Sequence, residues 1–489
     1  MKPRHIHIAD VWSVHNAGDA AILEALIAGL RVRWPEAHLS VAARFPETCT
    51  GLEGVEVLRD PLAFDEATCN AQAQDAPAAG EDWRKLAAIL DSADLVVSTG
   101  GYFLNGSEGN PFEWVLRSRL VRYERVLAKG TPLALLAQSY GPFQGERLHQ
   151  RVKSTLQRIP LVTARDVEGF ARLFCEGVSP RVALTADLAV TLPAAPPSAV
   201  DRTMQRLGIA DGMFALGVRN YPGTPTTAFA DVAALADDLI ARQGQKVLLI
   251  GTTVPPVDNP DICSAERALG NDDVQALECV LRSMRHPEGA VLVREALPPR
   301  LLQGVLGRCR AFISTRMHAS ILATCAGTPV VGIAYEPKVR GWFDQLAMPE
   351  MVLPLAQVSR ESLTAAAELL LHDNAALRAR LQRALPGVRG RAQENFSLLE
   401  ALVAAPRALP APSAIVADAR KSWEQESHHY DTLHVRLKRI VDLAEGTRGQ
   451  RLLDIGCSAG TLGAALSSRW TYHGCDISAS AVASEPRGT

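Results

Sequence analysis

The chain has no concentration of charge of either sign. Its 51 Lys and Arg residues nearly balance 53 Asp and Glu residues, which gives a net charge of -2, and the charges are spread without blocks. Proteins that bind nucleic acids usually gather basic residues on one face. This pattern therefore predicts no nucleic-acid partner.

Long apolar runs are also missing. A membrane-spanning helix needs about 18 or more consecutive apolar residues, and no such stretch occurs in the sequence. Residues 1–8 are too few to form a signal peptide, and His5 and His7 interrupt their apolar character. We therefore expect a cytoplasmic protein without a transmembrane segment.

The nine cysteines are scattered singly, and none forms a Cys-x-x-Cys pair. A chain of 489 residues can bury a large core and needs no disulfide framework. We expect the cysteines to be reduced and mostly buried. No group of His, Cys and carboxylate residues has the spacing of metal ligands, so the sequence predicts no metal and no required cofactor.

Short apolar strands alternate with helical patterns through most of the chain. The alternation predicts an α/β fold with parallel sheets, whose functional edge lies at the C-terminal ends of the strands. The stretch 68–81 shows no clear pattern and is expected to be a loop. The predicted strands span residues 5–11, 39–43, 95–97, 133–137, 161–164, 214–218, 246–250, 291–293, 311–313 and 330–334.

A proline-rich segment at 193–198 divides this pattern into two similar halves. We expect two Rossmann-like domains, 1–195 and 203–404, with a cleft between them that suits a ligand. A helical tail is expected to pack across the second half. After another proline-rich stretch the composition changes, and a third segment is expected at 415–489.

Arg316 and His318 follow the predicted strand 311–313 directly, where the next helix begins. The N-terminus of a helix attracts anions, and a guanidinium and an imidazole placed there strengthen the attraction. Lys338 and Arg340 follow the next strand. The arrangement predicts a site for a small, strongly negative ligand. The alternative is that Arg316 caps a loop and His318 belongs to the core.

Other strand ends carry further candidates. In the first loop, Gly18 would let the backbone approach a ligand, and Asp19 either caps the following helix or faces the site. Gly100 and Gly101 follow the strand 95–97, where a ligand could approach them. Arg219 follows the strand 214–218 and would face the cleft, unless it forms a surface salt bridge.

Seven short motifs carry a resemblance to a known family. They are Asn16-Ala-Gly18-Asp19-Ala-Ala-Ile22, Ser98-Thr-Gly100-Gly101, Gln138-Ser-Tyr-Gly141-Pro142, Thr163-Ala-Arg165-Asp166, Thr185-Ala-Asp187-Leu-Ala189, Arg316-Met-His318 and Tyr335-Glu-Pro-Lys338. Together, and in this order, they resemble motifs of the polysaccharide pyruvyl transferases over about residues 5–390. The resemblance implies a glycosyltransferase-B-like pair of Rossmann-like domains.

The resemblance also implies an activity: transfer of a pyruvyl ketal group from phosphoenolpyruvate to a sugar of a cell-surface polysaccharide or its lipid-linked precursor. Arg316, His318 and Arg219 would hold the donor, with His318 as general acid and Arg316 stabilising the departing phosphate. The further residues expected to bind substrate are Asn16, Gly18, Gly100, Gly101, Tyr335 and Lys338. A lipid-linked acceptor would bring the protein to the membrane surface.

One position departs from the family pattern. The family often has an Asp a few residues past the glycine motif, but here the stretch reads Asn105-Gly-Ser-Glu108. Glu108 is one candidate for the missing carboxylate, and Asp19 is the other.

The third segment contains Arg451-Leu-Leu-Asp454-Ile-Gly456-Cys-Ser-Ala-Gly460, followed about 20 residues later by Asp476. This resembles the glycine-rich motif and ribose-binding acid of class I methyltransferases that use S-adenosylmethionine. The chain ends at Thr489, after about two strands of such a domain. We expect a truncated segment, with S-adenosylmethionine as a cofactor only if this segment is functional.

Two other functions fit the same sequence. One is a nucleotide-sugar-dependent glycosyltransferase of the same two-domain fold. The other is a non-catalytic protein that binds sugars or anions in exopolysaccharide assembly.

Overall fold

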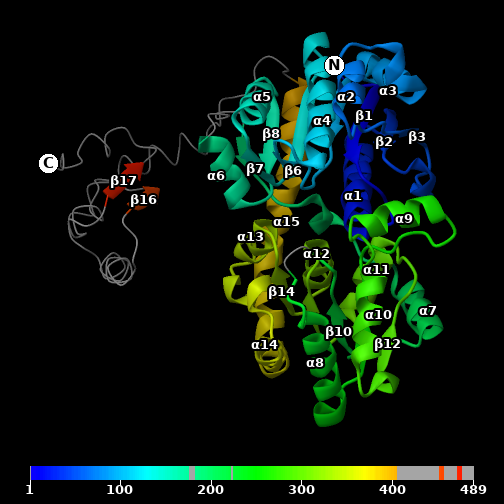
Figure 1. Ribbon diagram of the computed structural model, residues 1–489, viewed down its shortest axis with the longest axis vertical. Helices are drawn as coiled ribbons and strands as arrows, with labels where there is room; N and C mark the ends of the chain where they lie inside the picture. The colour runs from blue at the N-terminus through cyan, green and yellow to red at the C-terminus, as the bar shows by residue number, and fades with distance from the viewer. Residues whose placement is uncertain (1, 176–181, 222–223, 405–450, 456–470, 476–489) are drawn as a thin grey trace. The chain divides into compact units, whose positions relative to one another are not determined.

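The computed structural model describes residues 2–175, 182–221, 224–404, 451–455 and 471–475. The chain divides into two compact units, Met1–Leu409 and Pro410–Thr489. The first unit contains two parallel sheets, one in the blue-to-cyan half and one in the green-to-yellow half of Figure 1.

The first sheet has seven parallel strands in the order β3-β2-β1-β4-β6-β8-β9. The order reverses between β1 and β4, which is the kind of switch point where Rossmann-like folds bind ligands. The strands are β1 (His5–Val11), β2 (His38–Ala43), β3 (Val55–Arg59), β4 (Leu95–Ser98), β6 (Leu133–Gln138), β8 (Leu161–Ala164) and β9 (Val182–Leu184). The helices of this half are α1 (Ala17–Arg33), α2 (Glu66–Ala73), α3 (Gly80–Ser92), α4 (Pro111–Lys129), α5 (Glu146–Leu156) and α6 (Val167–Cys175). A separate parallel pair joins β5 (Leu104–Ser107) and β7 (Tyr140–Gln144).

The second sheet has six parallel strands in the order β12-β11-β10-β13-β14-β15, and it reverses between β10 and β13. The strands are β10 (Phe214–Gly217), β11 (Val247–Leu249), β12 (Ala290–Leu292), β13 (Ala311–Ser314), β14 (Val330–Ala334) and β15 (Val352–Pro354). The helices are α7 (Pro197–Leu207), α8 (Ala228–Gln243), α9 (Pro260–Ala268), α10 (Asp273–Ser283), α11 (Pro299–Gly307), α12 (Met317–Cys325), α13 (Pro337–Gln345), α14 (Arg360–His372) and α15 (Asn374–Ala404).

Central strands of both sheets are buried on both faces. Every residue of β6 is buried, and so is every residue of β13. Continuous apolar runs of this kind are typical of parallel strands covered by helices on two sides. The prediction of two Rossmann-like domains is confirmed.

The stretch 68–81, predicted to be a loop, is largely helical. It contains most of α2 and the start of α3. Asp65 begins α2 by accepting a hydrogen bond from the backbone N–H of Thr68 at 2.8 Å. The prediction was wrong because it relied on a periodic apolar pattern, which is weak here. The N-cap at Asp65 and the helix-favouring Ala and Gln residues form the helix instead.

Helix α15, the last described helix of the first unit, runs along both halves of that unit (Figure 1). It contacts β6 and β8, so the tail expected on the second half alone also covers the first sheet. The buried Asn395 makes the connection: its Oδ1 accepts from the hydroxyls of Thr163 at 2.6 Å and Thr185 at 3.0 Å. Its Nδ2 donates to the carbonyl of Ala186 at 3.1 Å.

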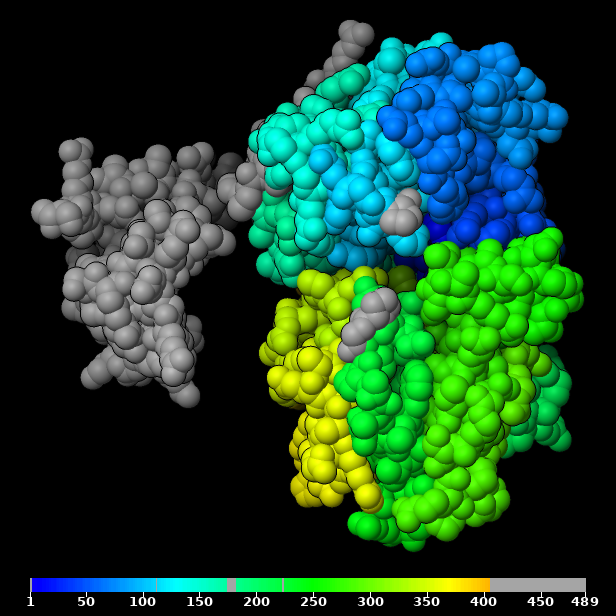
Figure 2. Space-filling model, in the orientation of Figure 1, coloured from blue at the N-terminus to red at the C-terminus, as the bar shows by residue number. Residues whose placement is uncertain are grey.

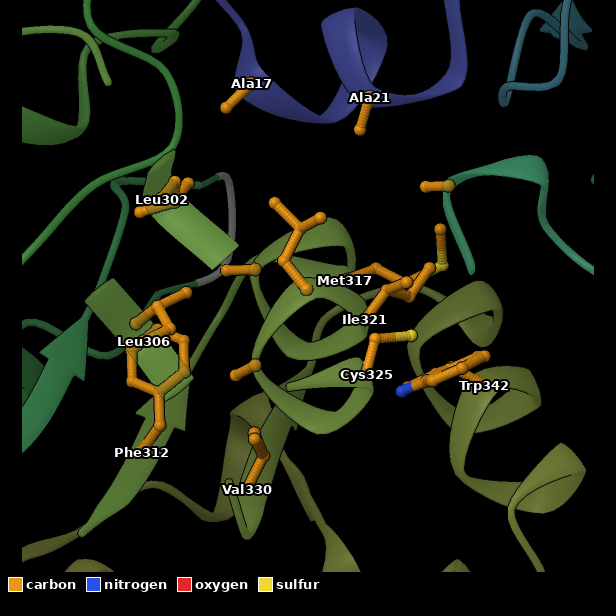
Figure 3. Packing of buried hydrophobic residues seen from close by; sticks show 14 of the residues in the cluster. Ala17, Ala21, Leu302, Leu306, Phe312, Met317, Ile321, Cys325, Val330 and Trp342 are labelled. Carbon is orange, nitrogen blue, oxygen red and sulfur yellow. The ribbon is translucent and has the colours of Figure 1, made fainter. Parts of the chain in front are cut away.

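One apolar core extends through both halves and surrounds α12 (Figure 3). Met317, Ile321 and Cys325 on α12 belong to the same buried cluster as Ala17 and Ala21 on α1. The small side chains of Ala17 and Ala21 allow the two helices to approach closely. The start of α1 is thereby held beside the start of α12.

Two parallel strands are described in the second unit, β16 (Arg451–Ile455) and β17 (Thr471–Cys475). Asp454 lies in β16, whereas Gly456, Gly460 and Asp476 lie outside the described residues. The methyltransferase-like motif stays a prediction. Among the helices that the structure describes, none combines the length and apolar character needed to cross a bilayer.

Candidate functional site

A cleft opens between the two halves, at the C-terminal ends of the central strands of both sheets (Figure 2). It contains a cavity of about 340 Å³. The predicted site residues that line it are Asn16, Asp19, Gly101, Arg219, Arg316, His318, Tyr335 and Lys338. The edge of an open parallel sheet and the junction of two domains are both preferred places for ligands.

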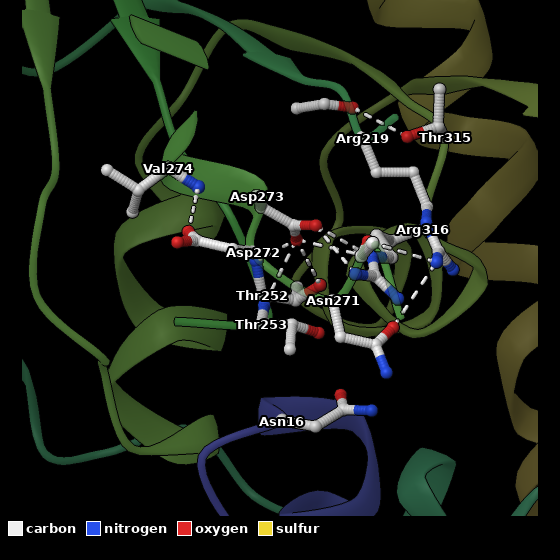
Figure 4. A network of polar contacts seen from close by, with 12 residues as sticks. Asn16, Arg219, Thr252, Thr253, Asn271, Asp272, Asp273, Val274, Thr315 and Arg316 are labelled. Carbon is white, nitrogen blue, oxygen red and sulfur yellow. Dashed lines mark hydrogen bonds and ion pairs between the residues drawn. The ribbon is translucent and has the colours of Figure 1, made fainter. Parts of the chain in front are cut away.

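Arg316 stands at the N-cap position of α12 and is fixed by a buried carboxylate. Its Nε and Nη2 donate to Oδ1 of Asp273 at 3.0 and 2.6 Å. The other carboxylate oxygen accepts from the backbone N–H groups of Thr252 and Thr253, both at 3.0 Å (Figure 4). Nη1 of Arg316 has no acceptor among the described residues, so it is free to bind a ligand.

Arg219 follows β10 and is held by neutral groups. Its Nη2 donates to the carbonyl of Gly270 and to Oδ1 of Asn271, both at 3.2 Å. Its Nη1 donates to the hydroxyl of Tyr335 at 3.5 Å. No carboxylate of the described part of the chain forms a direct ion pair with Arg219, although Glu336 is close enough for Arg219 to help lower its pKa. Arg219 therefore brings to the cavity a positive charge that no direct ion pair neutralises.

Lys338 lies near the same tyrosine. Its Nζ is 5.6 Å from the ring centroid of Tyr335 and 4.6 Å from that of Tyr102. It also lies 2.5 Å from Oε2 of Glu336. Burial opposes ionisation of that carboxyl, but Lys338 prevails and holds the pKa of Glu336 below its ordinary value.

His318 contacts a buried ion pair. Its Nε2 is 3.3 Å from Oδ2 of Asp187 and 3.4 Å from Nη1 of Arg165. The same Asp187 oxygen accepts from Arg165 at 2.7 Å. Although burial opposes the charged form, His318 and Arg165 hold the pKa of Asp187 well below its ordinary value. The carboxylate therefore orients the imidazole at the edge of the cavity.

Asn16, and not Asp19, caps α1: its Oδ1 accepts from the backbone N–H of Gly18 at 2.9 Å. Asp19 lines the cavity and has no hydrogen-bond partner among the described residues. Burial raises the pKa of Asp19, and the nearby His318 counteracts this only in part. Asp19 is therefore a carboxylate available for proton transfer.

Gly18 has a different role from the one expected. A Cβ at this position would lie 2.2 Å from Nδ1 of His318. The glycine thus makes room for the imidazole of the other half of the unit, and it does not line the cavity.

The two glycines that follow β4 also lie in different places. Gly101 lines the cavity, whereas Gly100 lies behind it, where a Cβ would be 2.9 Å from the carbonyl oxygen of Ala137. Glu108 lies outside the cavity lining, and its Oε1 accepts from the backbone N–H of Leu148 in the first turn of α5 at 2.7 Å. The structure thus places Glu108 at a helix end, so of the two carboxylate candidates only Asp19 lines the cavity.

Sequence reasoning missed the carboxylates that hold the cations. Asp273 directly follows Asp272, which does cap α10 by accepting from Val274 N–H at 3.1 Å. The sequence does not show which of the two acids caps the helix, and it does not show that Asp273 contacts Arg316. Asp187 stands in a motif quoted above, but its contact with His318 comes from the folded chain.

The family model for "Polysaccharide pyruvyl transferase" matches residues 16–337. Among curated proteins, the "Amylovoran biosynthesis protein AmsJ" of Erwinia amylovora is 22% identical over 402 residues, which cover 76% of this chain and 92% of that protein.

Two solved structures show the fold. One, assigned as a UDP-N-acetylglucosamine 2-epimerase of Listeria monocytogenes, has a TM-score of 0.52 at 15% identity and covers 84% of this chain and 99% of its own. The other, the sucrose-phosphate synthase of Thermosynechococcus elongatus, has a TM-score of 0.51 at 14% identity. It covers 82% of this chain and 98% of its own. The shared architecture is glycosyltransferase-B-like.

The family model begins at the cap of α1 and ends at the start of α13, so it includes both sides of the cavity. The chain therefore belongs to the polysaccharide pyruvyl transferase family of transferases.

Proposed function

We propose that the protein transfers a pyruvyl group from phosphoenolpyruvate to two hydroxyls of a sugar in a cell-surface polysaccharide or its lipid-linked precursor. The observation that carries the donor assignment is Arg219, which forms no direct ion pair with a described carboxylate, in the same cavity as Nη1 of Arg316. Phosphoenolpyruvate carries a carboxylate and a phosphate close together. Guanidinium groups bind both kinds of anion with paired hydrogen bonds.

The residues at the cavity suit the steps of the reaction. His318 gives a proton to the methylene carbon of the donor, which leaves a cation at the carbon that bears the phosphate. A sugar hydroxyl adds to this carbon, and its proton passes to Asp19. The bond to the phosphate oxygen then breaks, and Arg316 stabilises the departing phosphate. A second hydroxyl adds to the same carbon and closes the ketal; its proton returns to the imidazole of His318, and the proton held by Asp19 leaves with the phosphate.

This chemistry calls for no metal or cofactor. The methyltransferase-like motif, which includes Asp454, would act separately and stays a prediction. Any contact with a membrane surface would come through a lipid-linked acceptor.

Isothermal titration of phosphoenolpyruvate tests the donor site, with Arg219→Gln as the variant. Arg219 suits the test because its removal leaves no buried carboxylate unpaired, whereas removing Arg316 would strand Asp273. We expect the dissociation constant to rise at least about tenfold, or about 1.4 kcal/mol. Arg340→Gln is the matched control, because Arg340 is exposed and does not line the cavity. It should bind as the wild type does.

Parallel titrations with UDP and an assay of phosphate release separate the alternatives. Binding of UDP without phosphoenolpyruvate would contradict the proposal and favour a nucleotide-sugar glycosyltransferase. Donor binding without phosphate release, for any sugar acceptor offered, would favour a non-catalytic binding protein.

A further inference from the structure

The two walls of the cavity differ in chemistry. The wall from the second half carries the cations Arg219, Arg316 and Lys338. The wall from the first half is aromatic and carries two cations, Arg119 and Arg165, of which Arg165 is paired with Asp187. Its aromatic residues are Trp12, Tyr102, Phe103 and Phe112. A donor that is a small anion fits the second-half wall and leaves the first-half wall for another ligand.

Arg119 is only 4% exposed, and it is held firmly. Its Nε donates to Oδ1 of Asp10 at 3.2 Å, and its Cζ lies 4.6 Å from the ring centroid of Phe103. Asp10 is in turn fixed by the hydroxyls of Ser98, at 2.5 Å, and Tyr123. Neither Nη atom of Arg119 has an acceptor among the described residues, although the side chain lines the cavity. A guanidinium fixed in this way offers two parallel N–H donors to a pair of oxygen atoms.

Phe112 differs from the other aromatic residues of this wall. Arg44 lies 4.1 Å from the ring centroid of Trp12, and Lys338 lies 4.6 Å from that of Tyr102. No such cation covers the ring of Phe112 among the described residues, and its side chain is 45% exposed. An uncovered aromatic face beside polar donors is suited to the C–H face of a sugar ring.

We propose that the first-half wall is the acceptor subsite, in which a pyranose packs on Phe112 and two of its oxygens accept from the Nη atoms of Arg119. The inference rests on the proposed function, because it assigns the other substrate of the same cavity. Asp19, the base for the acceptor hydroxyl, comes from the same half of the chain. The two oxygens belong either to a uronic acid carboxylate or to neighbouring hydroxyls; both offer the paired acceptors that a guanidinium recognises.

Saturation-transfer NMR on the full chain tests this subsite, with methyl hexopyranosides and the matching methyl hexopyranosiduronates as probes. We expect the wild type to bind at least one probe, and Phe112→Ala to weaken that binding at least about fivefold. Phe64→Ala is the matched control, since Phe64 is 44% exposed and lies outside the cavity lining. It should bind as the wild type does.

Arg119→Lys identifies the source of the two oxygens, because lysine keeps a charge beside Asp10 and loses the paired donors. Weaker binding of the uronates alone assigns a carboxylate, and weaker binding of both probe classes assigns hydroxyls. Equal binding by Phe112→Ala and Phe64→Ala would overturn the subsite, as would a wild type that binds no probe. Failure of the wild type to bind phosphoenolpyruvate would overturn the proposed function and leave the sugar-binding result intact.

Discussion

The cations at the cavity are paired with carboxylates, with Arg219 as the exception within the described ranges. Pairing lets a charged side chain stay largely buried and fixed in direction, which an unpaired charge cannot do without a large desolvation cost. Arg219 instead donates to neutral acceptors, so its charge has no direct ion-pair partner at the cavity. The pairs are Arg316 with Asp273, Lys338 with Glu336, Arg165 with Asp187 and Arg119 with Asp10.

In the proposed mechanism Asp19 is the base for the acceptor hydroxyl, and its burial lowers stability; Asp19→Asn tests both effects. Burial raises the pKa of Asp19, so ionisation costs more in the folded chain than in the unfolded one. This loss of folding free energy is absent below the pKa of an unfolded Asp, about 3.9, and reaches its full size above the raised pKa of Asp19 in the folded chain. Asparagine carries no charge and avoids this loss. For a gain of about 1 kcal/mol in the free energy of unfolding, we expect the melting temperature to be about 2 °C higher at pH 7 and unchanged near pH 4. Phosphate release should fall at least about 100-fold through loss of the base.

Glu24→Gln is the control for Asp19→Asn. Burial also raises the pKa of Glu24, but Glu24 does not line the cavity of the proposed site. It should give a similar rise in melting temperature at neutral pH with unchanged phosphate release. A lower melting temperature for Asp19→Asn at pH 7 would mean that the ionised carboxylate is favourably paired after all.

The elements that build the site are two helices that begin at the cavity, α1 in the first half and α12 in the second. Both are rich in small buried residues, which lets them pack closely across the two halves (Figure 3). The contact between Gly18 and His318 is part of this packing, so the position of His318 depends on a helix from the other half.

Gly18→Ala should disturb that contact. The new methyl group would fall 2.2 Å from Nδ1 of His318, so one helix must shift. Overpacking of this kind costs about 1–3 kcal/mol, and we expect a lower melting temperature together with slower phosphate release. Gly390→Ala is the control on an exposed part of α15, where a Cβ meets nothing within 4 Å. It should be neutral or stabilising by up to about 1 kcal/mol. An unchanged Gly18→Ala enzyme would show that the helices can separate without loss.

At the scale of the whole first unit, α15 ties the two sheets that share the cavity. It begins beside the second sheet and reaches Thr163 and Thr185 through Asn395. A cavity made by two domains keeps its geometry only while the domains hold their relative positions.

Asn395→Ala should loosen this connection. It removes the acceptor of the Thr163 hydroxyl and the donor to the carbonyl of Ala186, and it leaves the Thr185 hydroxyl only its 3.3 Å bond to the carbonyl of Ala164. We expect this to cost about 2–4 kcal/mol. We expect a lower melting temperature and faster hydrogen exchange in β8. Asn374→Ala is the control, because Asn374 bonds to Arg310 and Leu370 within the second half. It should leave exchange in β8 unchanged, and equal exchange in both variants would argue against α15 as the tie.

The sequence alone was enough for the two-domain architecture, because apolar strands, polar strand ends and helix starts are local patterns that repeat along the chain. For the same reason it placed Arg316, His318 and Asp19 at strand ends or helix starts, and these three residues line the cavity. The tertiary structure decided which side chains meet there. Asp273 pairs with Arg316 from 43 residues away, Gly18 yields space to His318, and Glu108 turns to a helix end. These outcomes depend on distances between separate elements, which no local pattern encodes.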